Sequence, residues 1–285
     1  MSHDHLCEAK RKKDDEFFTR GADVVAELVH YTSCFEGKVV CCNADGQSSA
    51  FMSYFVENFH ALGLEELFCT SIKGECFDYD GSTMTVTRID DGDFRSNDSV
   101  RLLEQADIIV TNPPFSLFRE YMTQLLDHGK DFLVIGPKSA ISYKVVFNSI
   151  HEGRVRLGYT NPNQFDTPTG PVNLQGLCRW FTTLSTPGKT FWTPTATIDD
   201  TESVKYDLYP ALNYDKVSLL PKEFDGLAGI PLTALDKLDL NEYELVDMIS
   251  RYAVLDHTYD TPGHQLTEIN GKPRFSRLII KKLNK

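Results

Sequence analysis

The sequence lacks several features that would assign it to a common functional class. It has no run of eighteen apolar residues, so no transmembrane helix is expected, and its first residues do not form a signal peptide. Its seven cysteines are odd in number and show no paired C-x₂-C spacing, which argues against a structural zinc site. We therefore expect a cytoplasmic protein with reduced thiols, no membrane contact and no metal.

Positive charge is also scarce. The chain carries 29 Lys and Arg residues against 41 Asp and Glu residues, which gives a formal net charge of −12. A protein of this charge does not hold nucleic acid by bulk electrostatics, so any DNA-binding surface must gather its cations on one face. The sequence gathers them in the run Lys10–Lys13 and in the last fourteen residues.

What the sequence does contain is a regular alternation of strand and helix patterns. Its 285 residues, 41% of them hydrophobic, are enough for a full core. Expected strands are 38–42, 67–71, 84–89, 108–111, 132–135 and 179–184. Expected helices begin near residues 24, 49, 98, 117 and 143, and the second of them ends at Leu62 before the natural C-cap Gly63. Repeated strand–helix pairs predict a doubly wound, mostly parallel sheet.

The composition changes near residue 185, where Thr, Pro and Gly become frequent. We therefore predict a catalytic domain over residues 1–189 and a partly β appendage over residues 190–285. A hairpin is predicted near the C-terminus, with arms 265–269 and 275–280 joined by Asn270-Gly271. Candidate nucleic-acid contacts in and after this hairpin are Lys272, Arg274, Arg277 and Lys281. The alternative is an exposed edge strand that lysines protect from aggregation.

One turn dominates the middle of the chain. Ile108–Thr111 is a short β-branched run, and Asn112 is followed at once by Pro113 and Pro114, which cannot donate to a β-ladder. A helical pattern begins after Phe115. The pattern predicts a rigid turn at the carboxyl end of a strand, where open α/β sheets bind their ligands.

The groups that this turn presents suit one kind of substrate. An exocyclic amine in the plane of a flat base has two N–H donors, which the Asn112 side-chain oxygen and the Pro113 carbonyl could accept, while Phe115 stacks on the ring. Accepting both protons frees the nitrogen lone pair for an electrophile. The alternative is a Pro-rich turn that only ends a strand, with Phe115 in the core.

Several fragments occur in an order that resembles the EcoRI-type family of adenine-specific DNA methyltransferases. These are Asp15-Glu16-Phe17-Phe18-Thr19, Val40-Cys41-Cys42-Asn43-Ala44-Asp45, Gly92-Asp93-Phe94-Arg95-Ser96, Thr111-Asn112-Pro113-Pro114-Phe115-Ser116-Leu117-Phe118-Arg119-Glu120, Ala140-Ile141-Ser142-Tyr143-Lys144, Arg179-Trp180-Phe181-Thr182, Asn213-Tyr214-Asp215 and Gly229-Ile230-Pro231-Leu232-Thr233-Ala234-Leu235-Asp236-Lys237. The likeness covers nearly the whole chain.

The resemblance implies a Rossmann-like fold of the class I methyltransferase type and direct transfer of a methyl group from S-adenosylmethionine to adenine N6. The partner would be double-stranded DNA, with the target base flipped into the pocket, in a restriction–modification setting. Asn112, Pro113, Pro114 and Phe115 would be catalytic, and Tyr143 is a candidate second wall for the base. The residues implied to hold the cofactor, besides Asn112, are Phe17, Thr19, Asn43, Asp45, Asp93 and Phe94. Residues 190–285 would recognise the target sequence.

Two departures from the resemblance leave alternatives open. The first turn has Gly46 alone in place of a Gly-rich loop, and the second strand ends without the carboxylate that usually binds a ribose. One alternative is a methyltransferase that acts on an RNA base or a protein glutamine, and another is a non-catalytic DNA-binding or decoy protein. The oligomeric state is open, with a monomer favoured.

Overall fold

The structure is a computed structural model that describes residues 17–198, 203–250 and 266–283. The chain divides into two compact units, which meet in the sequence between Gly188 and Lys189. The run Lys10–Lys13 lies outside the described residues, as does Gln265 at the start of the expected hairpin. None of the helices in the described ranges is long and apolar enough to cross a membrane.

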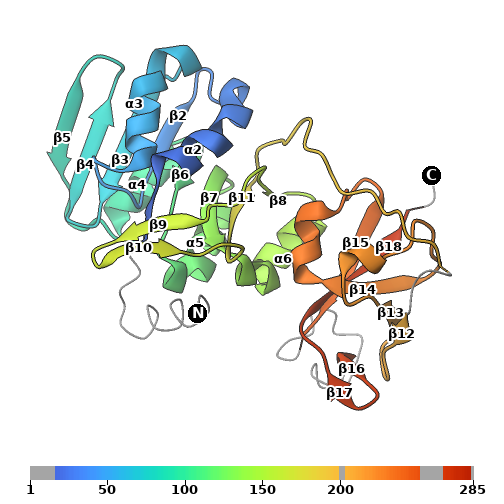
Figure 1. Cartoon of the computed structure of the whole chain (residues 1–285). Coiled ribbons are helices and arrows are strands. Elements are labelled where there is room, and N and C mark those ends of the chain that lie inside the picture. The colour runs from blue at the N-terminus through green and yellow to red at the C-terminus, as the bar shows by residue number, and fades with distance from the viewer. Residues whose placement is uncertain (1–16, 199–202, 251–265, 284–285) are drawn as a thin grey trace. The chain divides into compact units, whose positions relative to one another are not determined.

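The first unit contains a mixed eight-stranded sheet (Figure 1). In spatial order its strands are β5 (Met84–Arg88), β4 (Glu75–Tyr79), β3 (Glu66–Ser71), β2 (Val39–Cys42), β6 (Ile108–Thr111), β7 (Asp131–Pro137), β11 (Cys178–Thr182) and β8 (Arg156–Leu157). The four strands from β3 to β7 pair in parallel, whereas the pairings on both flanks are antiparallel. The expected parallel arrangement therefore describes the centre of the sheet, and the two flanks differ from it.

Helices cover both faces of this sheet (Figure 1). They are α2 (Gly21–Leu28), α3 (Ala50–Leu62), α4 (Asn97–Gln105), α5 (Phe118–Asp127) and α6 (Lys144–His151), with short 3₁₀ turns η1 (Val29–Cys34), η2 (Phe115–Leu117) and η3 (Lys138–Ser142). Val40 and Cys42 pack in the core under α2 and α3, whereas the intervening Cys41 is equally buried on the other face. Alternate residues of a central strand are thus buried on opposite faces, as a sheet between two helical layers requires.

The helix ends follow the capping signals of the sequence. Ser49 caps α3 by accepting from the Met52 amide at 3.1 Å, and Gly63 ends the same helix with a left-handed φ of 66°. Ser96 caps α4 by accepting from the Ser99 amide at 3.1 Å. Each cap satisfies a backbone group that the helix itself leaves unpaired.

A second, three-stranded sheet in the first unit was not expected from the sequence. It consists of β1 (Phe18–Thr19), β9 (Gln164–Thr167) and β10 (Gly170–Asn173), in the order β1-β9-β10 and all antiparallel. This sheet brings the first described residues alongside a hairpin about 150 residues further along the chain.

The second unit has a five-stranded sheet in the order β12 (Val204–Lys205), β13 (Ala211–Asn213), β14 (Leu227–Pro231), β18 (Arg277–Lys282) and β15 (Tyr243–Ile249). Two 3₁₀ turns, η4 (Val217–Leu219) and η5 (Leu232–Lys237), connect its strands. The unit's core includes Tyr206, Tyr209, Ile249 and Ile279.

The expected C-terminal hairpin is only partly correct. Its turn is present, because Asn270 and Gly271 have φ values of 53° and 68° between β16 (Glu268–Ile269) and β17 (Lys272–Pro273). The expected second arm, residues 275–280, does not pair with the first arm. Instead, β18 lies between β14 and β15, where four successive buried residues, Arg277 to Ile280, fill the middle of the sheet.

Candidate active site

The Asn-Pro-Pro turn lies at the carboxyl end of a central strand. All four residues of β6 are buried, and β6 pairs in parallel with β2 on one side and β7 on the other. Asn112 and Pro113 follow directly, and Pro114 is the N-cap of η2. The turn is therefore fixed at the edge of the sheet where the neighbouring parallel strands also end.

The two polar atoms of the Asn112 side chain differ in hydrogen bonding. Its Nδ2 donates to the backbone carbonyl of Phe17 at 2.5 Å. Its Oδ1 is buried and has no hydrogen-bond partner. A buried acceptor without a donor costs about 1–3 kcal/mol, and no residue in the described ranges donates to this oxygen.

Three aromatic rings close over the turn. The Phe115 ring stacks on Phe17 with a centroid separation of 5.4 Å and an interplanar angle of 28°. Phe165 meets both rings edge-on, at 6.1 Å from Phe17 and 6.4 Å from Phe115. Only 2% of Phe115 is exposed. The face that would stack on a base is therefore covered by a ring of the same chain.

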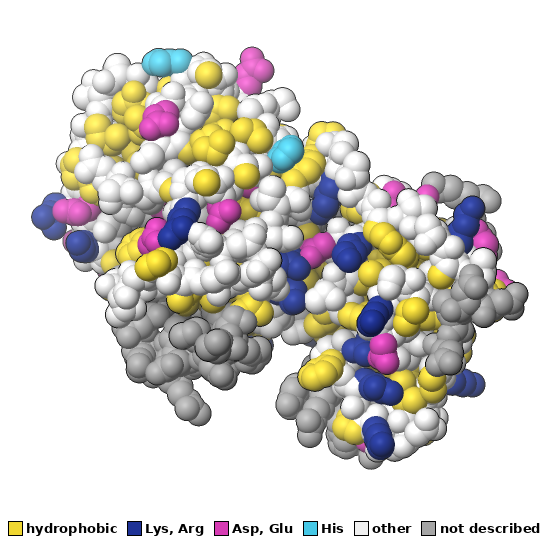
Figure 2. Space-filling view, viewed as in Figure 1, with side chains coloured by type: hydrophobic (Ala, Val, Ile, Leu, Met, Phe, Trp, Pro, Cys, Tyr) yellow, Lys and Arg dark blue, Asp and Glu magenta, His cyan; other side chains and the backbone are white. Residues whose placement is uncertain are grey.

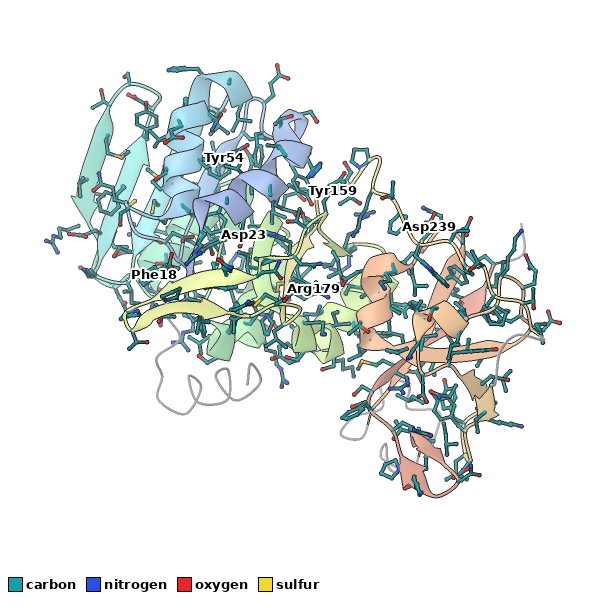
Figure 3. All side chains as sticks on the ribbon, in the orientation of Figure 1. Phe18, Asp23, Tyr54, Tyr159, Arg179 and Asp239 are labelled. Carbon is teal, nitrogen blue, oxygen red and sulfur yellow. The ribbon has the colours of Figure 1, made fainter. Side chains whose placement is uncertain are left out.

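The β1 strand holds Phe17 in this position. Phe18, labelled in Figure 3, pairs with Asp166 of β9, and Thr19 pairs with Phe165. Arg20 adds an ion pair, with Nη2 2.8 Å from the Asp166 carboxylate. Thr19 Oγ1 is buried without a partner among the described residues, which makes it a second unpaired polar atom in this part of the structure. Because Phe18 is 53% exposed and the ion pair is also exposed, this connection is weakly held.

The end of β2 contributes a carboxylate and an amide. The half-buried Asp45 accepts from the Thr111 hydroxyl and from the Asn112 backbone amide. Burial raises the pKa of Asp45 to about 7, even though both hydrogen bonds favour the charged form. Buried Asn43 accepts from the Tyr121 hydroxyl, and its Nδ2 has no partner.

The loop before α4 brings Asp93 and Phe94 to the same region. It passes so close to β3 that a Cβ built on Gly92 would lie 1.9 Å from the Ser71 carbonyl oxygen. The Phe94 ring meets Tyr121 edge-on at 5.0 Å, and the Phe94 carbonyl accepts from Gln124 at 3.0 Å. Phe94 and Asn43 are thus linked through contacts with one tyrosine.

The Asp93 carboxylate is already engaged. Arg95 donates to it from Nε at 2.9 Å and from Nη2 at 2.7 Å, and these bonds lower the pKa of Asp93. A carboxylate has about four lone-pair sites, so Asp93 retains capacity for a further donor. The side chain is 25% exposed, which leaves that capacity accessible.

Comparison with known proteins identifies the family. The sequence matches the family described as "Adenine-specific methyltransferase EcoRI" over residues 5–88 and 80–283. It is 34% identical to the Type II methyltransferase M.MgeORF184P of Mycoplasma genitalium, over 98% of both chains. Identity is 33% with M.MpnI of Mycoplasma pneumoniae, over 96% of both chains. The chain belongs to the EcoRI-type family of adenine-specific methyltransferases.

M.EcoRI of Escherichia coli is also similar to the chain, with 32% identity over 97% of this chain and 95% of the relative. No solved structure matches the chain described here. Membership of the EcoRI-type family confirms the resemblance expected from the sequence. It also makes the chain an enzyme, which answers the alternative of a non-catalytic binding protein.

The structure brings most of the expected site residues together. Phe17 contacts Asn112 and Phe115, and Asp45 contacts Thr111 and the Asn112 backbone. Tyr121 and Thr111 were not singled out from the sequence, although each holds an expected residue in place. A buried tyrosine at helical spacing has the same sequence pattern as an ordinary core residue, and Tyr121 lies just after the fragment that ends at Glu120.

Tyr143 lines a cavity of about 700 Å³ in the same unit. The guanidinium of Arg119 lies 4.6 Å from the centre of the Tyr143 ring, and Phe94, Arg95 and Ser116 also border the cavity. Because the cationic group of Arg119 covers one face of the ring, a base could stack on that face of Tyr143 only after Arg119 moves. Among the described residues, no group of three or more His, Cys, Asp or Glu side chains is arranged to hold a metal.

The four candidate DNA contacts of the second unit differ in exposure. Lys272 and Lys281 are exposed, and the Arg274 side chain is 40% exposed. Arg277 is instead buried, donating to Asn213 at 3.0 Å and to Asp215 at 2.9 Å. Its donors are used inside the unit, so we leave Arg277 out of the proposed DNA surface. Figure 2 shows Lys and Arg side chains gathered over one face of this unit.

Proposed function

We propose that the chain transfers a methyl group from S-adenosylmethionine to the N6 amino group of adenine in double-stranded DNA, within a restriction–modification setting. The observation that carries the proposal is the buried, unpartnered Oδ1 of Asn112. An amide oxygen fixed at the end of β6 is an acceptor for one N–H of an exocyclic amine. The adenine-specific family supports this acceptor over a guanine base or a glutamine side chain.

The polar atoms around the turn fit the expected cofactor. Asn43 Nδ2 and Thr19 Oγ1 are buried without partners, and the Asp45 carboxylate lies at the end of β2 beside Asn112. Asn43, Thr19 and Asp45 would hold the polar groups of S-adenosylmethionine, while Asp93 and Phe94 would bind its adenine ring. A bound cofactor supplies a methyl group on a positively charged sulfonium, which needs no further activation by the protein.

The protein's part in the reaction is to position the acceptor. The Asn112 Oδ1 and the Pro113 carbonyl would accept hydrogen bonds from the two N6 N–H groups, which directs the nitrogen lone pair out of the plane of the base. When N6 gains the methyl group, one of its two protons is released. Phe115 would stack on the base and replace part of the stacking lost when the base leaves the duplex. The Phe17 ring now covers Phe115, so the base must displace it.

The test is the substitution Asn112→Ala. Loss of one preorganised group that stabilises the transition state lowers the rate by a factor of about 10² to 10³, so methyl transfer to unmethylated genomic DNA should fall by that amount. The midpoint of thermal unfolding and the affinity for S-adenosylmethionine should change little. Asn241→Ala, in an exposed turn of the second unit, is the control that should keep full activity.

Two outcomes would contradict the proposal. A near-normal rate for Asn112→Ala would remove Asn112 from the chemistry. Identifying the methylated product tests the second outcome. Methyl groups found on RNA or on a protein, but not on adenine in DNA, would assign a different acceptor to the same turn.

A further inference from the structure

The segment that follows the β17 strand presents an aromatic side chain to solvent. Phe275 is 87% exposed, which is more than any other large hydrophobic side chain in the described parts of the chain. A single exposed apolar residue is common on protein surfaces and needs no explanation by itself. Phe275 differs because its backbone is held on both sides and its neighbours are cationic.

The chain before Phe275 is fixed to the hairpin. The Asp207 carboxylate accepts from the amides of Asn270 and Gly271, at 2.9 and 2.8 Å, which holds the turn between β16 and β17. The Arg274 amide then donates to the Thr267 carbonyl at 3.1 Å. The backbone is therefore anchored up to the residue immediately before Phe275.

The chain after Phe275 is fixed by a buried arginine. Arg277 Nη1 donates to the Phe275 carbonyl at 3.1 Å, while its Nη2 is paired with Asp215. The hydroxyl of Ser276 is hydrogen-bonded to that of Ser250 at 2.9 Å. Arg277, which the sequence suggested as a DNA contact, thus acts as an internal brace for the segment that presents Phe275.

The sequence around Phe275 is rich in positively charged residues. Residues 270–285 contain six Lys and Arg residues and no Asp or Glu. Lys272 is exposed, and the Arg274 side chain is 40% exposed, with its Nη1 3.9 Å from the Asp215 carboxylate. An exposed aromatic ring on a braced backbone, directly preceded by two cationic residues, is complementary to a nucleobase next to phosphates.

We propose that Phe275 stacks against a nucleobase of the DNA by inserting at a base step, while Lys272 and Arg274 contact the adjacent phosphates. This inference rests on the proposed function, because it takes double-stranded DNA as the substrate. Apolar side chains inserted between base steps unstack and kink a duplex, and an enzyme that flips a base leaves a gap that such a ring can fill.

The experiment measures DNA binding without turnover. Fluorescence anisotropy is recorded with a labelled random-sequence duplex of about 30 base pairs, and with the same duplex carrying one abasic site, at several salt concentrations. Wild-type protein should prefer the abasic duplex, because the gap accepts the ring without unstacking. Phe275→Ala should lose this preference and bind the abasic duplex about 5- to 150-fold more weakly, the range for removing one aromatic–base stack.

The salt dependence separates stacking from charge. Removing an apolar ring releases no counterions, so Phe275→Ala should keep the wild-type slope of log K against log salt, whereas Lys272→Gln should reduce its magnitude by about 0.9. Leu208→Ala, a 52% exposed apolar residue of the same unit, is the matched control and should change neither quantity. Because Phe275 is exposed, its replacement should leave the thermal midpoint unchanged.

Several outcomes would overturn the inference. If wild type and Phe275→Ala bind each duplex with the same affinity, the ring does not contact bases. Unchanged DNA binding together with loss of self-association in sedimentation would assign Phe275 to a protein interface. These results are distinct from failure of the proposed function, which would appear as wild-type protein that binds DNA and methylates none of it.

Discussion

At the scale of single residues, the site is marked by buried polar atoms that have no hydrogen-bond partner among the described residues. Asn112 Oδ1, Asn43 Nδ2 and Thr19 Oγ1 are all buried without partners in one region of the first unit. Asn112 follows β6, Asn43 follows β2 and Thr19 ends β1. Buried polar atoms are nearly always paired in folded proteins, so these unpaired atoms support the ligand site of the proposed function.

The raised pKa of Asp45 predicts how the stability of the protein depends on pH. Its folded pKa of about 7 lies above the ordinary value of 3.8, so between these values the folded chain retains a proton that the unfolded chain has released. Stability contributed by this proton is present below pH 4 and is lost as the pH rises to 7. Asp45→Asn should therefore become more stable relative to wild type over this interval, by roughly 1–3 kcal/mol.

Denaturant unfolding of both proteins at pH 4, 5.5 and 7 measures this difference. The comparison between the two proteins matters, because carboxylates with lowered pKa values, such as Asp93 and Asp215, give wild type and variant the same opposing slope. A stability difference that does not vary with pH would mean that Asp45 ionises normally in the folded chain.

At the scale of elements, the loop that carries Asp93 depends on one glycine. Gly92→Ala would place a methyl group against the backbone of Ser71, which cannot move without disturbing β3. We expect a loss of about 1–3 kcal/mol in unfolding free energy and weaker binding of S-adenosylmethionine, measured by denaturation and calorimetry. Gly46→Ala is the control, since a Cβ there meets no atom within 4 Å.

The β1 strand supports a prediction about Phe17. Under the proposed function the base displaces this ring from Phe115. Phe17→Ala should therefore lower the KM for DNA about 2- to 12-fold at unchanged kcat, corresponding to an aromatic stack of about 0.5–1.5 kcal/mol. Phe18→Ala, which removes an exposed ring of the same strand, should not change KM. Weaker cofactor binding with an unchanged KM for DNA would instead place Phe17 on the cofactor side of the site.

Elements with strong local signals could be predicted from the sequence. Helix α3 has an apolar face, the cap Ser49 and the terminating Gly63, and β6 is a β-branched run that two prolines end. The strands β4, β9 and β10 could not be predicted in the same way. Their residues are mostly polar or half-exposed, and β9 pairs with a strand about 150 residues away, which leaves no local pattern.

The same limit applies to the site. The position of the Asn-Pro-Pro turn at a strand end follows from the sequence, because a β-branched run precedes Asn112 and two prolines follow it. That Arg95 already binds Asp93, that Arg119 covers Tyr143 and that Arg277 is buried all depend on side chains meeting in three dimensions. An arginine in a basic segment has the same sequence pattern whether it faces solvent or a buried aspartate.

At the scale of the whole molecule, the net charge of −12 requires that any DNA-binding surface be local. Arg274 and Lys281 are candidates for that surface in the second unit. Replacing both by Gln should reduce the magnitude of the slope of log K against log salt by one to two units and weaken DNA binding, while S-adenosylmethionine affinity stays the same. Lys205→Gln, on the exposed β12, is the control for a change of charge elsewhere in the unit.

Anisotropy titrations over a range of salt concentrations provide the measurement. An unchanged slope in the double variant would move the phosphate-binding surface elsewhere, and the run Lys10–Lys13, outside the described residues, would be the next segment to test.

Under the proposed function, the covered face of Phe115 affects how much S-adenosylmethionine is lost to small molecules. A growing cell holds free adenine nucleotides in large excess over target sites, and each carries the same amine as the base in DNA. A free nucleotide must displace the Phe17 ring with the interactions of one base and its phosphates alone. A duplex has a long phosphate backbone whose binding can offset that displacement. The closed rings would thus act as a filter that protects the methyl donor from futile transfer to small molecules.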